Sequence, residues 1–341
     1  VSPAQDGPAN KGHTCVKGRF AHQFTRSRDR LTAPLVREGD GFRIASWEEA
    51  LDRIATGLGR IKAEHGPDAI AGLASSRGTN EDCYAFQRLF RTAIGTHNVD
   101  NCSRVCHSPT AYGLRRSLGL SGGTSTFDSI EAAQVLLVVG ANPTEGHPVV
   151  GARMKQAALA GTRIVTADPR RIELADYGVL HCPVRPGTNA AFLNGIAHVI
   201  IRDGLVDRAF VEARTAGFDE LAALVAAYTP ERVEVLSGVP AESVVRAARL
   251  YGEADRASIA WGLGVTEQRY GSECVQLIAN LALLTGKIGR LGCALMPLRG
   301  QNNVQGSSDM GALPDTFSAY RSVADEAVAR SFEERWGVRM K

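Results

Sequence analysis

A cysteine stands directly beside a histidine at Cys106 and His107, just before a proline that can open a helix. Pro109 suits the first turn of a helix, so the thiol of Cys106 would lie near a helix N-terminus, where a thiolate is favoured. A thiolate is a nucleophile or a metal ligand, and an imidazole beside it can titrate near neutral pH. The pair could therefore bind a metal and handle protons. Catalytic Cys-His pairs normally meet in space rather than in sequence, so for the pair alone a structural role is the more common outcome.

The other cysteines do not complete a metal site by their spacing. Cys102 and Cys106 form a C-x3-C pair, but zinc needs further ligands, and the cysteines after them fall inside predicted strands or helices. Cys15 has no C-x-x-C partner, so by itself it is more often structural. Seven cysteines scattered over 341 residues do not resemble the disulfide framework of a small secreted protein. Reduced thiols or metal ligands are expected.

Several loops that follow predicted strands combine Gly or Pro with hydrogen-bond donors: "SSRGTN", "GANPTEGHP", "ADPRR", "RPGTN" and "GLGVTEQ". In open parallel sheets, ligands bind beyond the carboxyl ends of the strands, and backbone amides at helix N-termini can face phosphates. Together the loops could hold a large, polar, phosphate-bearing ligand, although any one of them is equally typical of an ordinary turn. The loop at Gly140 is not a G-x-G-x-x-G, which argues against a nicotinamide dinucleotide. Asp168 could still accept hydrogen bonds from a ribose or an amino-pyrimidine ring.

Alternating strands and helices must position these loops, and their order predicts an α/β protein with a parallel sheet. The clearest βαβ unit has a strand at Gln134–Gly140, a helix at Val149–Ala160 and a strand at Arg163–Asp168. Ser46 and Glu49 form an S-x-x-E capping box for a helix that ends near residue 66. Further predictions are a hairpin near 34–46, a strand at 69–75, a helix at 80–94, a strand from 257, a helix at 272–286 and a long, polar, functional loop at 297–315.

Composition and charge exclude several classes of protein. The chain has 44% hydrophobic and 22% charged residues, and its net charge of +3 is not gathered into a basic run. This composition predicts two packed domains or one large α/β unit, and the charge gives no electrostatic case for nucleic acid. The apolar runs are shorter than a membrane span requires, and no export signal is visible. A cytoplasmic location is the default expectation.

Read together, these motifs resemble the molybdenum- or tungsten-dependent oxidoreductases that carry two pyranopterin guanine dinucleotides, and among them the catalytic subunit of formate dehydrogenase. The resemblance rests on "RVCHSP" (104–109), "RGQNNVQGSSDMGALPD" (299–315) and "HTCVKGR" (13–19). "GANPTEGHPV", "DPRR", "RPGTN" and "NLALLTGKIGRLG" follow in the expected order, so nearly the whole chain is covered. The resemblance implies Rossmann-like α/β domains with parallel sheets, of the type found in molybdopterin oxidoreductases.

The resemblance also implies roles for the motif residues. Cys106 would ligate molybdenum or tungsten, His107 would handle protons, and Arg299 would bind the carboxylate of formate through two parallel hydrogen bonds. Cys15 would be the last of four cysteines that bind a [4Fe-4S] cluster, and Lys17 would lie between that cluster and one pterin. Formate would be oxidised to carbon dioxide, and partner subunits with iron-sulfur clusters or flavin would take the electrons. The candidate cofactor-binding residues are Lys17, Arg77, Gly140, Asn142, Glu145, His147, Asp168, Arg170, Pro186, Gly187, Thr188, Asn189, Gly262, Gly264, Gln268, Gly300 and Gln301.

The same resemblance predicts a division into domains. Residues 1–45 would be a remnant of an iron-sulfur domain, and residues 46–130 with 300–341 would form a first α/β domain that carries the metal-ligating cysteine. Residues 131–299 would form a second α/β domain that binds a pterin guanine dinucleotide. No cysteine precedes Cys15, and the β-rich domain that closes this family's cofactor site does not follow Lys341. We therefore expect an internal fragment of a larger subunit.

Two other classes of protein stay open at this point. A nitrate reductase of the same superfamily shares the metal-ligating cysteine but is not expected to place a histidine directly after it. A structural subunit of the kind found in respiratory complex I keeps the fold without the metal site, and an inactive fragment would behave in the same way. The presence of Cys106, His107 and Arg299 together favours formate dehydrogenase.

Overall fold

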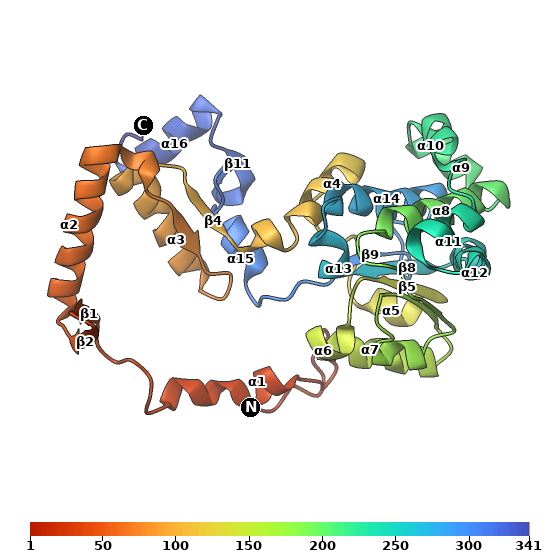
Figure 1. Ribbon diagram of the computed structural model, residues 1–341, viewed down its shortest axis with the longest axis horizontal. Helices are drawn as coiled ribbons and strands as arrows, with labels where there is room; N and C mark the ends of the chain where they lie inside the picture. The colour runs from red at the N-terminus through yellow and green to blue at the C-terminus, as the bar shows by residue number, and fades with distance from the viewer. Residues whose placement is uncertain (341) are drawn as a thin grey trace. The chain divides into compact units, whose positions relative to one another are not determined.

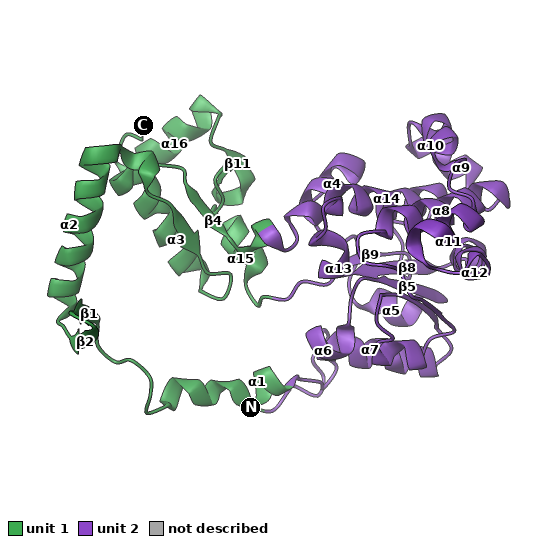
Figure 2. Cartoon of the chain, in the orientation of Figure 1, with its two compact units in different colours: residues 1, 16–104, 301–341 green, residues 2–15, 105–300 purple. Residues whose placement is uncertain are grey.

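The computed structural model describes residues 1–340, and the chain folds as two units (Figure 1, Figure 2). The smaller unit comprises residue 1, residues 16–104 and the chain from 301 onward, and the larger unit comprises residues 2–15 and 105–300. No helix within residues 1–340 is both long enough and apolar enough to cross a membrane. The three-part division that the resemblance implies stays a prediction.

The larger unit is built on a sheet of five parallel strands in the order β7-β6-β5-β8-β9. The central strand, β5, is buried along its whole length, which is typical of parallel sheets that are covered on both faces. The strands are β5 (Val135–Val139), β6 (Arg163–Ala167), β7 (Leu180–Cys182), β8 (Ala257–Trp261) and β9 (Leu295–Pro297). The predicted α/β fold with a parallel sheet is confirmed.

Helices cover both faces of this sheet (Figure 1). One face packs on α4 (Ser108–Leu118), α8 (Asn189–Arg202), α12 (Ala241–Glu253) and α14 (Gly271–Leu284). The other face packs on α5 (Asp128–Ala132) and α7 (Pro148–Leu159). The shorter helices of this unit are α6 (Pro143–Gly146), α9 (Arg208–Arg214), α10 (Phe218–Val225), α11 (Pro230–Ser237) and α13 (Leu263–Thr266).

The two helices that adjoin the candidate site begin where local sequence directs them. α4 has Pro109 in its first turn, and α7 has Pro148 in its first turn, because proline there loses no intrahelical hydrogen bond. α4 ends at Gly119, whose φ of 75° is the left-handed conformation that glycine adopts at helix ends. The prediction of Val149–Ala160 for α7 differs from the observed Pro148–Leu159 by one residue at each end, and the predicted helix opening at Pro109 is confirmed by α4.

The smaller unit combines short sheets with five helices. Its strands form an antiparallel pair of β1 (Leu35–Glu38) and β2 (Gly41–Ile44), a parallel pair of β3 (Gly72–Ala74) and β4 (Val99–Asn101), and an antiparallel pair of β10 (Thr316–Phe317) and β11 (Arg321–Ser322). The predicted hairpin is thus confirmed. The helices are α1 (Val16–Phe20), α2 (Trp47–His65), α3 (Asn80–Leu89), α15 (Val304–Asp309) and α16 (Glu326–Trp336).

The capping box predicted for α2 is only half formed. The Ser46 hydroxyl accepts a hydrogen bond from the Glu49 amide at 3.1 Å, but the Glu49 carboxylate pairs with Arg43 instead of reaching back to the helix start. A complete capping box occurs at α3, where Thr79 and Asp82 satisfy one another's backbone amides.

The polar stretch 297–315, predicted as a long loop, contains helix α15. Asn303 precedes this helix and donates its Nδ2 to the carbonyl of Gly78 at 2.9 Å. Buried Arg91 holds the chain after the helix by donating to three backbone carbonyls between 311 and 316. Tertiary contacts therefore order a segment whose Gly, Asn and Ser content disfavours a helix.

Candidate functional site

Four strand-end loops of the larger unit line one pocket of about 550 Å³. The loops follow β5, β6, β7 and β8, so the pocket lies beyond the carboxyl ends of the parallel strands, as predicted. β6 and β7 are added on one side of β5, and β8 and β9 are added on the other. The strand order therefore reverses between β5 and β8. Such a switch point is where open α/β sheets bind their ligands.

Most of the predicted cofactor-binding residues of the larger unit lie in this pocket. They are Gly140, Asn142, Glu145, His147, Asp168, Arg170, Pro186, Asn189, Gly262, Gly264 and Gln268. Gly187, Thr188 and Gly300 do not line it, and Lys17, Arg77 and Gln301 belong to the smaller unit. Arg185, which is not among the residues predicted from the sequence, lines the pocket directly before the predicted turn at Pro186. Its charge and its place in a strand-end loop were the signals that could have identified it.

The loops after β5 and β8 touch through their backbones at Gly140 and Gly264. The Gly264 amide donates to the Gly140 carbonyl at 2.9 Å. Gly140 has a φ of +55°, and a Cβ atom on it would lie 2.7 Å from the carbonyl carbon of Gly264. Glycine is required where backbones approach this closely. This part of the pocket is therefore lined by backbone, which a ligand can approach without meeting a side chain.

Charged and polar side chains surround the remainder of the pocket. Asp168 is 7% exposed, and its Oδ1 accepts from the Arg170 amide at 2.9 Å. Asn189, the first residue of α8, donates its Nδ2 to the carbonyl of Gly264 at 2.9 Å. Arg170 and Arg185 add positive charge. A buried carboxylate together with two guanidinium groups suits a ligand that carries both a nucleobase and phosphates.

Several buried polar atoms at the pocket have no hydrogen-bond partner within residues 1–340. Asn142 Oδ1 and His147 Nδ1 belong to residues that line the pocket, and Thr144 Oγ1 and Thr266 Oγ1 lie in the short helices α6 and α13 beside it. A buried polar atom without a partner costs about 1–3 kcal/mol, and native structures keep few of them. The two atoms that belong to pocket-lining residues, Asn142 Oδ1 and His147 Nδ1, are therefore the ones that a polar ligand in the pocket could satisfy.

Two histidine side chains, His107 and His147, bond to the backbone of the segment that contains Arg299. His107 Nε2 lies 2.9 Å from the carbonyl oxygen of Leu298, 191 residues away in the chain. His147 Nε2 lies 2.9 Å from the next carbonyl oxygen, that of Arg299. Because a carbonyl oxygen only accepts, both histidines carry a proton on Nε2 and donate it. The structure thus brings together the segments that hold the three predicted catalytic residues.

His107 itself is buried, with 1% of its surface exposed. Its Nδ1 lies 2.9 Å from Thr110 Oγ1, which in turn accepts from the indole Nε1 of Trp261 at 2.9 Å. Burial lowers the pKa of His107 to about 4, and burial also lowers the pKa of His147. The expectation that His107 titrates near neutral pH is therefore wrong, because the ring is neutral and both its nitrogens have partners.

The Thr110→Val substitution is expected to destabilise the protein by about 1–3 kcal/mol, since it leaves Trp261 Nε1 and His107 Nδ1 buried without their shared partner. Valine has nearly the shape of threonine, so the packing would change little. Urea unfolding followed by tryptophan fluorescence measures the effect. Thr110→Ser is the control, because it keeps the hydroxyl. Equal unfolding midpoints for the valine variant and the wild type would show that the Trp261–Thr110–His107 chain contributes nothing.

The remaining predicted site residues lie as follows. Cys106 is 4% exposed and stands two residues before α4, so its predicted place beside a helix N-terminus is confirmed. Arg299 Nη2 donates to the carbonyl of Ser121 at 3.2 Å. Cys15 ends the N-terminal segment that packs with the larger unit. Within residues 1–340, no group of three or more His, Cys, Asp or Glu side chains is arranged to hold a metal ion.

Comparison with known proteins finds relatives over nearly the whole chain. Residues 30–333 match the family described as Molybdopterin oxidoreductase, and residues 1–27 match the Molybdopterin oxidoreductase Fe4S4 domain. The chain is 43% identical over 323 residues to the F420-dependent formate dehydrogenase 2 subunit alpha of Methanococcus maripaludis, a match that covers 95% of this chain and 47% of the relative. It is 42% identical over 342 residues to formate dehydrogenase H of Escherichia coli, covering 98% of this chain and 48% of the relative.

A solved structure shares the fold. Acetylene hydratase from Pelobacter acetylenicus superposes with a TM-score of 0.75 and 26% identity, over 86% of this chain and 40% of that one. The chain therefore spans about half the length, or less, of the relatives it matches. The fold expected from the resemblance is confirmed.

Proposed function

The chain belongs to the molybdopterin oxidoreductase family, and from this premise we propose that it is the catalytic core of a molybdenum- or tungsten-dependent formate dehydrogenase. In the proposed reaction, formate is converted to carbon dioxide with release of one proton and two electrons. The identities of 43% and 42% to proteins named formate dehydrogenase support this substrate. The acetylene hydratase is more distant, at 26% identity.

One structural observation supports the proposal in addition to family membership. The hydrogen bond from His107 Nε2 to the Leu298 carbonyl connects the candidate metal ligand, Cys106, with the candidate substrate-binding residue, Arg299. A thiolate for the metal, an imidazole for the proton and a guanidinium for the carboxylate are the groups that formate oxidation requires. They come from segments that are far apart in the chain, so their meeting supports a functional site.

The two matched domains indicate a molybdopterin and a 4Fe-4S cluster as the cofactors. The pocket fits part of such a cofactor, because it offers a backbone wall at Gly140 and Gly264, the carboxylate of Asp168, and buried polar atoms that await partners. We assign to it the guanine dinucleotide of one pterin, with Cys106 as a ligand of the metal and Cys15 as a ligand of the cluster. When bound, the metal centre would supply a two-electron acceptor and the cluster a carrier of single electrons.

The protein's own residues would bind formate and take its proton. The planar guanidinium of Arg299 would hold both carboxylate oxygens through parallel N–H donors. The hydrogen bonds at Ser121 and from His147 fix the side chain and the backbone of Arg299, respectively. His107 would hold the proton at Nδ1 only transiently, because its pKa of about 4 keeps the resting ring neutral and its Nε2 already carries the proton that it donates to Leu298. Partner subunits with iron-sulfur clusters or flavin would take the electrons, and the cytoplasm is the proposed compartment.

Elemental analysis of the purified protein together with dye-linked assays tests the proposal. We expect molybdenum or tungsten in stoichiometric amount, iron, and reduction of a viologen dye that depends on formate and not on acetate. Oxidation of reduced dye by nitrate, without formate activity, would instead favour the nitrate reductase class. Folded protein that takes up neither metal nor pterin would favour a structural subunit of the complex I type.

A further inference from the structure

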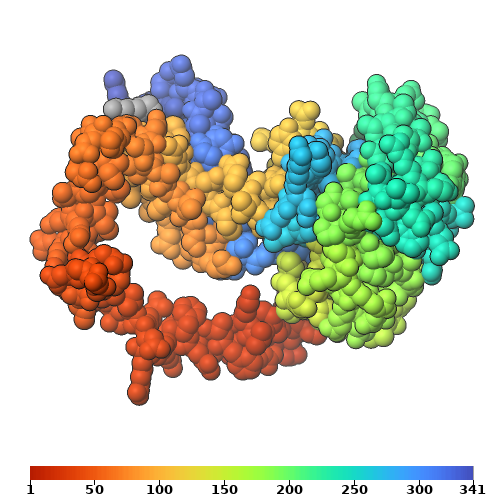
Figure 3. Space-filling view, viewed as in Figure 1, coloured from red at the N-terminus to blue at the C-terminus, as the bar shows by residue number. Residues whose placement is uncertain are grey.

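Residues 2–15, which end at Cys15, pack with the larger unit. In the space-filling view, the darkest red atoms, at the start of the chain, meet the yellow-green surface that includes α7 (Figure 3). Helix α7 begins directly after His147, which lines the pocket. One helix therefore adjoins both the pocket and the segment that carries the proposed cluster ligand. Because a helix rises 1.5 Å per residue, Arg153 lies about 9 Å along α7 from His147.

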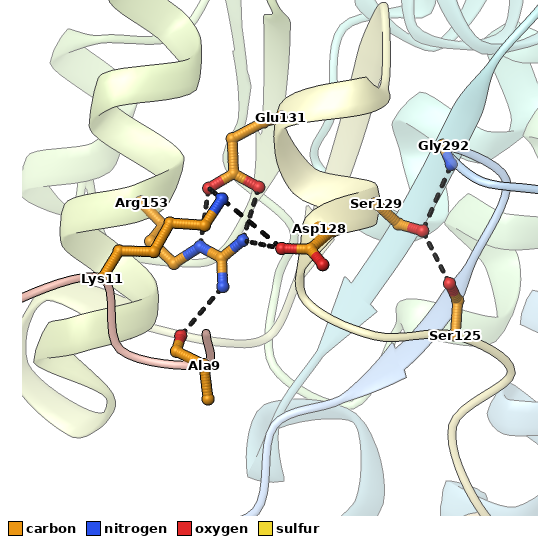
Figure 4. Close-up of polar contacts among 8 residues, drawn as sticks. All are labelled: Ala9, Lys11, Ser125, Asp128, Ser129, Glu131, Arg153 and Gly292. Atoms are coloured by element: carbon orange, nitrogen blue, oxygen red, sulfur yellow. Dashed lines mark hydrogen bonds and ion pairs between the residues drawn. The ribbon is translucent and has the colours of Figure 1, made fainter. Parts of the chain in front are cut away.

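Arg153, in the middle of α7, has a buried guanidinium surrounded by partners (Figure 4). Its side chain is 1% exposed. Nε donates to Glu131 Oε1 at 2.6 Å, and Nη2 donates to Glu131 Oε2 and to Asp128 Oδ1, both at 2.7 Å. A guanidinium that meets a carboxylate through two parallel bonds is the strongest pairing that arginine forms. The hydrogen bonding to the Glu131 carboxylate is the main cause that raises the pKa of Arg153, which therefore stays charged.

The third guanidinium nitrogen of Arg153 binds the N-terminal segment. Nη1 donates to the backbone carbonyl of Ala9 at 2.9 Å (Figure 4). Lys11 approaches the same carboxylates, with its Nζ 3.4 Å from Asp128 Oδ1 and 3.6 Å from Glu131 Oε1. Two cations and two carboxylates thus balance, which offsets the cost of burying the guanidinium. The segment is held both by its backbone and by a side chain.

The turn between Ala9 and Cys15 continues this attachment toward the cysteine. The Lys11 amide donates to the Gly7 carbonyl at 2.8 Å, and the His13 amide donates to the Asn10 carbonyl at 2.8 Å. His13 Nε2 lies 3.3 Å from Gln156 Nε2, about one helical turn beyond Arg153 on α7. Cys15 follows two residues after His13. The turn is therefore internally bonded through His13, so a shift of Ala9 is transmitted to within two residues of Cys15.

The carboxylates that hold Arg153 belong to helix α5, which is itself anchored to the core. In α5, Ser129 Oγ accepts from the Gly292 amide at 3.2 Å and lies 2.7 Å from Ser125 Oγ (Figure 4). The next residue, Ile130, is fully buried in the core under the sheet. Since α5 cannot shift without breaking these contacts, Asp128 and Glu131 hold Arg153 in one orientation.

We propose that Arg153 is a positioning residue for the iron-sulfur cluster. Through the Ala9 carbonyl and the carboxylates of α5, it sets where Cys15 lies relative to the pterin pocket. The inference rests on the proposed function, in which Cys15 is a cluster ligand. Arg153 itself lies outside every motif that carries the family resemblance. A displaced Cys15 would alter the geometry and surroundings of the cluster, which the electron paramagnetic resonance (EPR) spectrum of the reduced cluster reports.

The test compares Arg153→Met and Lys11→Met with Lys155→Met in the intact, cofactor-containing protein. Lys155 is the matched control, because it lies on α7 but pairs with Glu173, at 2.6 Å, instead of with α5. Hydrogen exchange of the amides of residues 7–13 and the EPR spectrum of the dithionite-reduced cluster are measured. For Arg153→Met we expect at least about tenfold faster exchange there, with unchanged exchange in β5, and an altered or lost cluster spectrum. Lys11→Met should show smaller changes of the same kind, and Lys155→Met none.

Slow exchange at residues 7–13 in both test variants would overturn the attachment. Faster exchange with an unaltered cluster spectrum would overturn the positioning role. Rapid exchange in β5 would reveal that Arg153→Met does not fold. In that case Lys11→Met decides between the same outcomes. The Lys11 side chain is 48% exposed, so its loss leaves the core intact. Dithionite reduces the cluster without formate. A protein with a cluster but no formate oxidation would therefore refute the proposed function and not this inference.

Discussion

Replacing Cys106 with serine is expected to lower the rate of formate oxidation by at least about a hundredfold, since loss of residues that only support a metal ligand already costs 10- to 100-fold. A serine oxygen is a poorer partner than a thiolate for a metal held by sulfur ligands. X-ray absorption at the molybdenum or tungsten edge should show one sulfur neighbour fewer. The exchange of sulfur for oxygen is nearly isosteric, so the buried site should keep its packing.

Cys102→Ser is the matched control for this substitution, because it makes the same chemical change four residues upstream. We expect it to retain the wild-type rate and the wild-type absorption spectrum. Full activity and an unaltered metal spectrum in Cys106→Ser would remove Cys106 from the metal site.

The Arg299→Lys variant is expected to lose about 10- to 150-fold in kcat/KM for formate, because hydrogen bonds to charged groups contribute about 1.5–3 kcal/mol. A lysine ammonium keeps the charge but cannot reproduce the two parallel donors of the guanidinium. Steady-state kinetics over a range of formate concentrations measures the loss. The lysine also loses the hydrogen bond that the guanidinium donates to the Ser121 carbonyl, so urea unfolding is measured beside the kinetics.

Arg290→Lys controls for the general effect of exchanging arginine for lysine in the same unit. Arg290 pairs with Asp255 at 2.9 Å and does not line the pocket. We expect its kinetics to equal those of the wild type. If Arg299→Lys matches the control in both KM and kcat, Arg299 does not bind the substrate.

The sheet and the pocket could be predicted from sequence because their signals are local. Strand β5 reads as one apolar run, and the loop after it begins with Gly140, so the strand and the glycine turn are visible within ten residues. Helix α15 could not be predicted in this way. Its sequence, "VQGSSD", favours turns, and the helix depends on contacts with residues such as Gly78, more than two hundred positions away.

The candidate site shows the same contrast between features with a local sequence signal and features set by distant contacts. The identities of Cys106, His107 and Arg299 were visible as motif residues, whereas the environment of His107 was not. Its burial, and hence its lowered pKa, depends on Thr110, Trp261 and the carbonyl of Leu298. Thr110 alone had a local signal, since it lies three residues after His107 and so shares a face of α4 with it. Arg153 had no signal, because its partners are fixed only by the fold.

The contact between Gly140 and Gly264 has a consequence for engineering the specificity of this protein. A library of variants that includes either position would be depleted of folded members, because any side chain at Gly140 would overlap the Gly264 backbone. The useful library positions lie instead on the side-chain wall of the pocket, at Asp168, Arg170 and Arg185. If the pocket holds the proposed guanine dinucleotide, altered nucleotide preference should arise from changes in charge at these three positions and not from changes in the volume near the glycines.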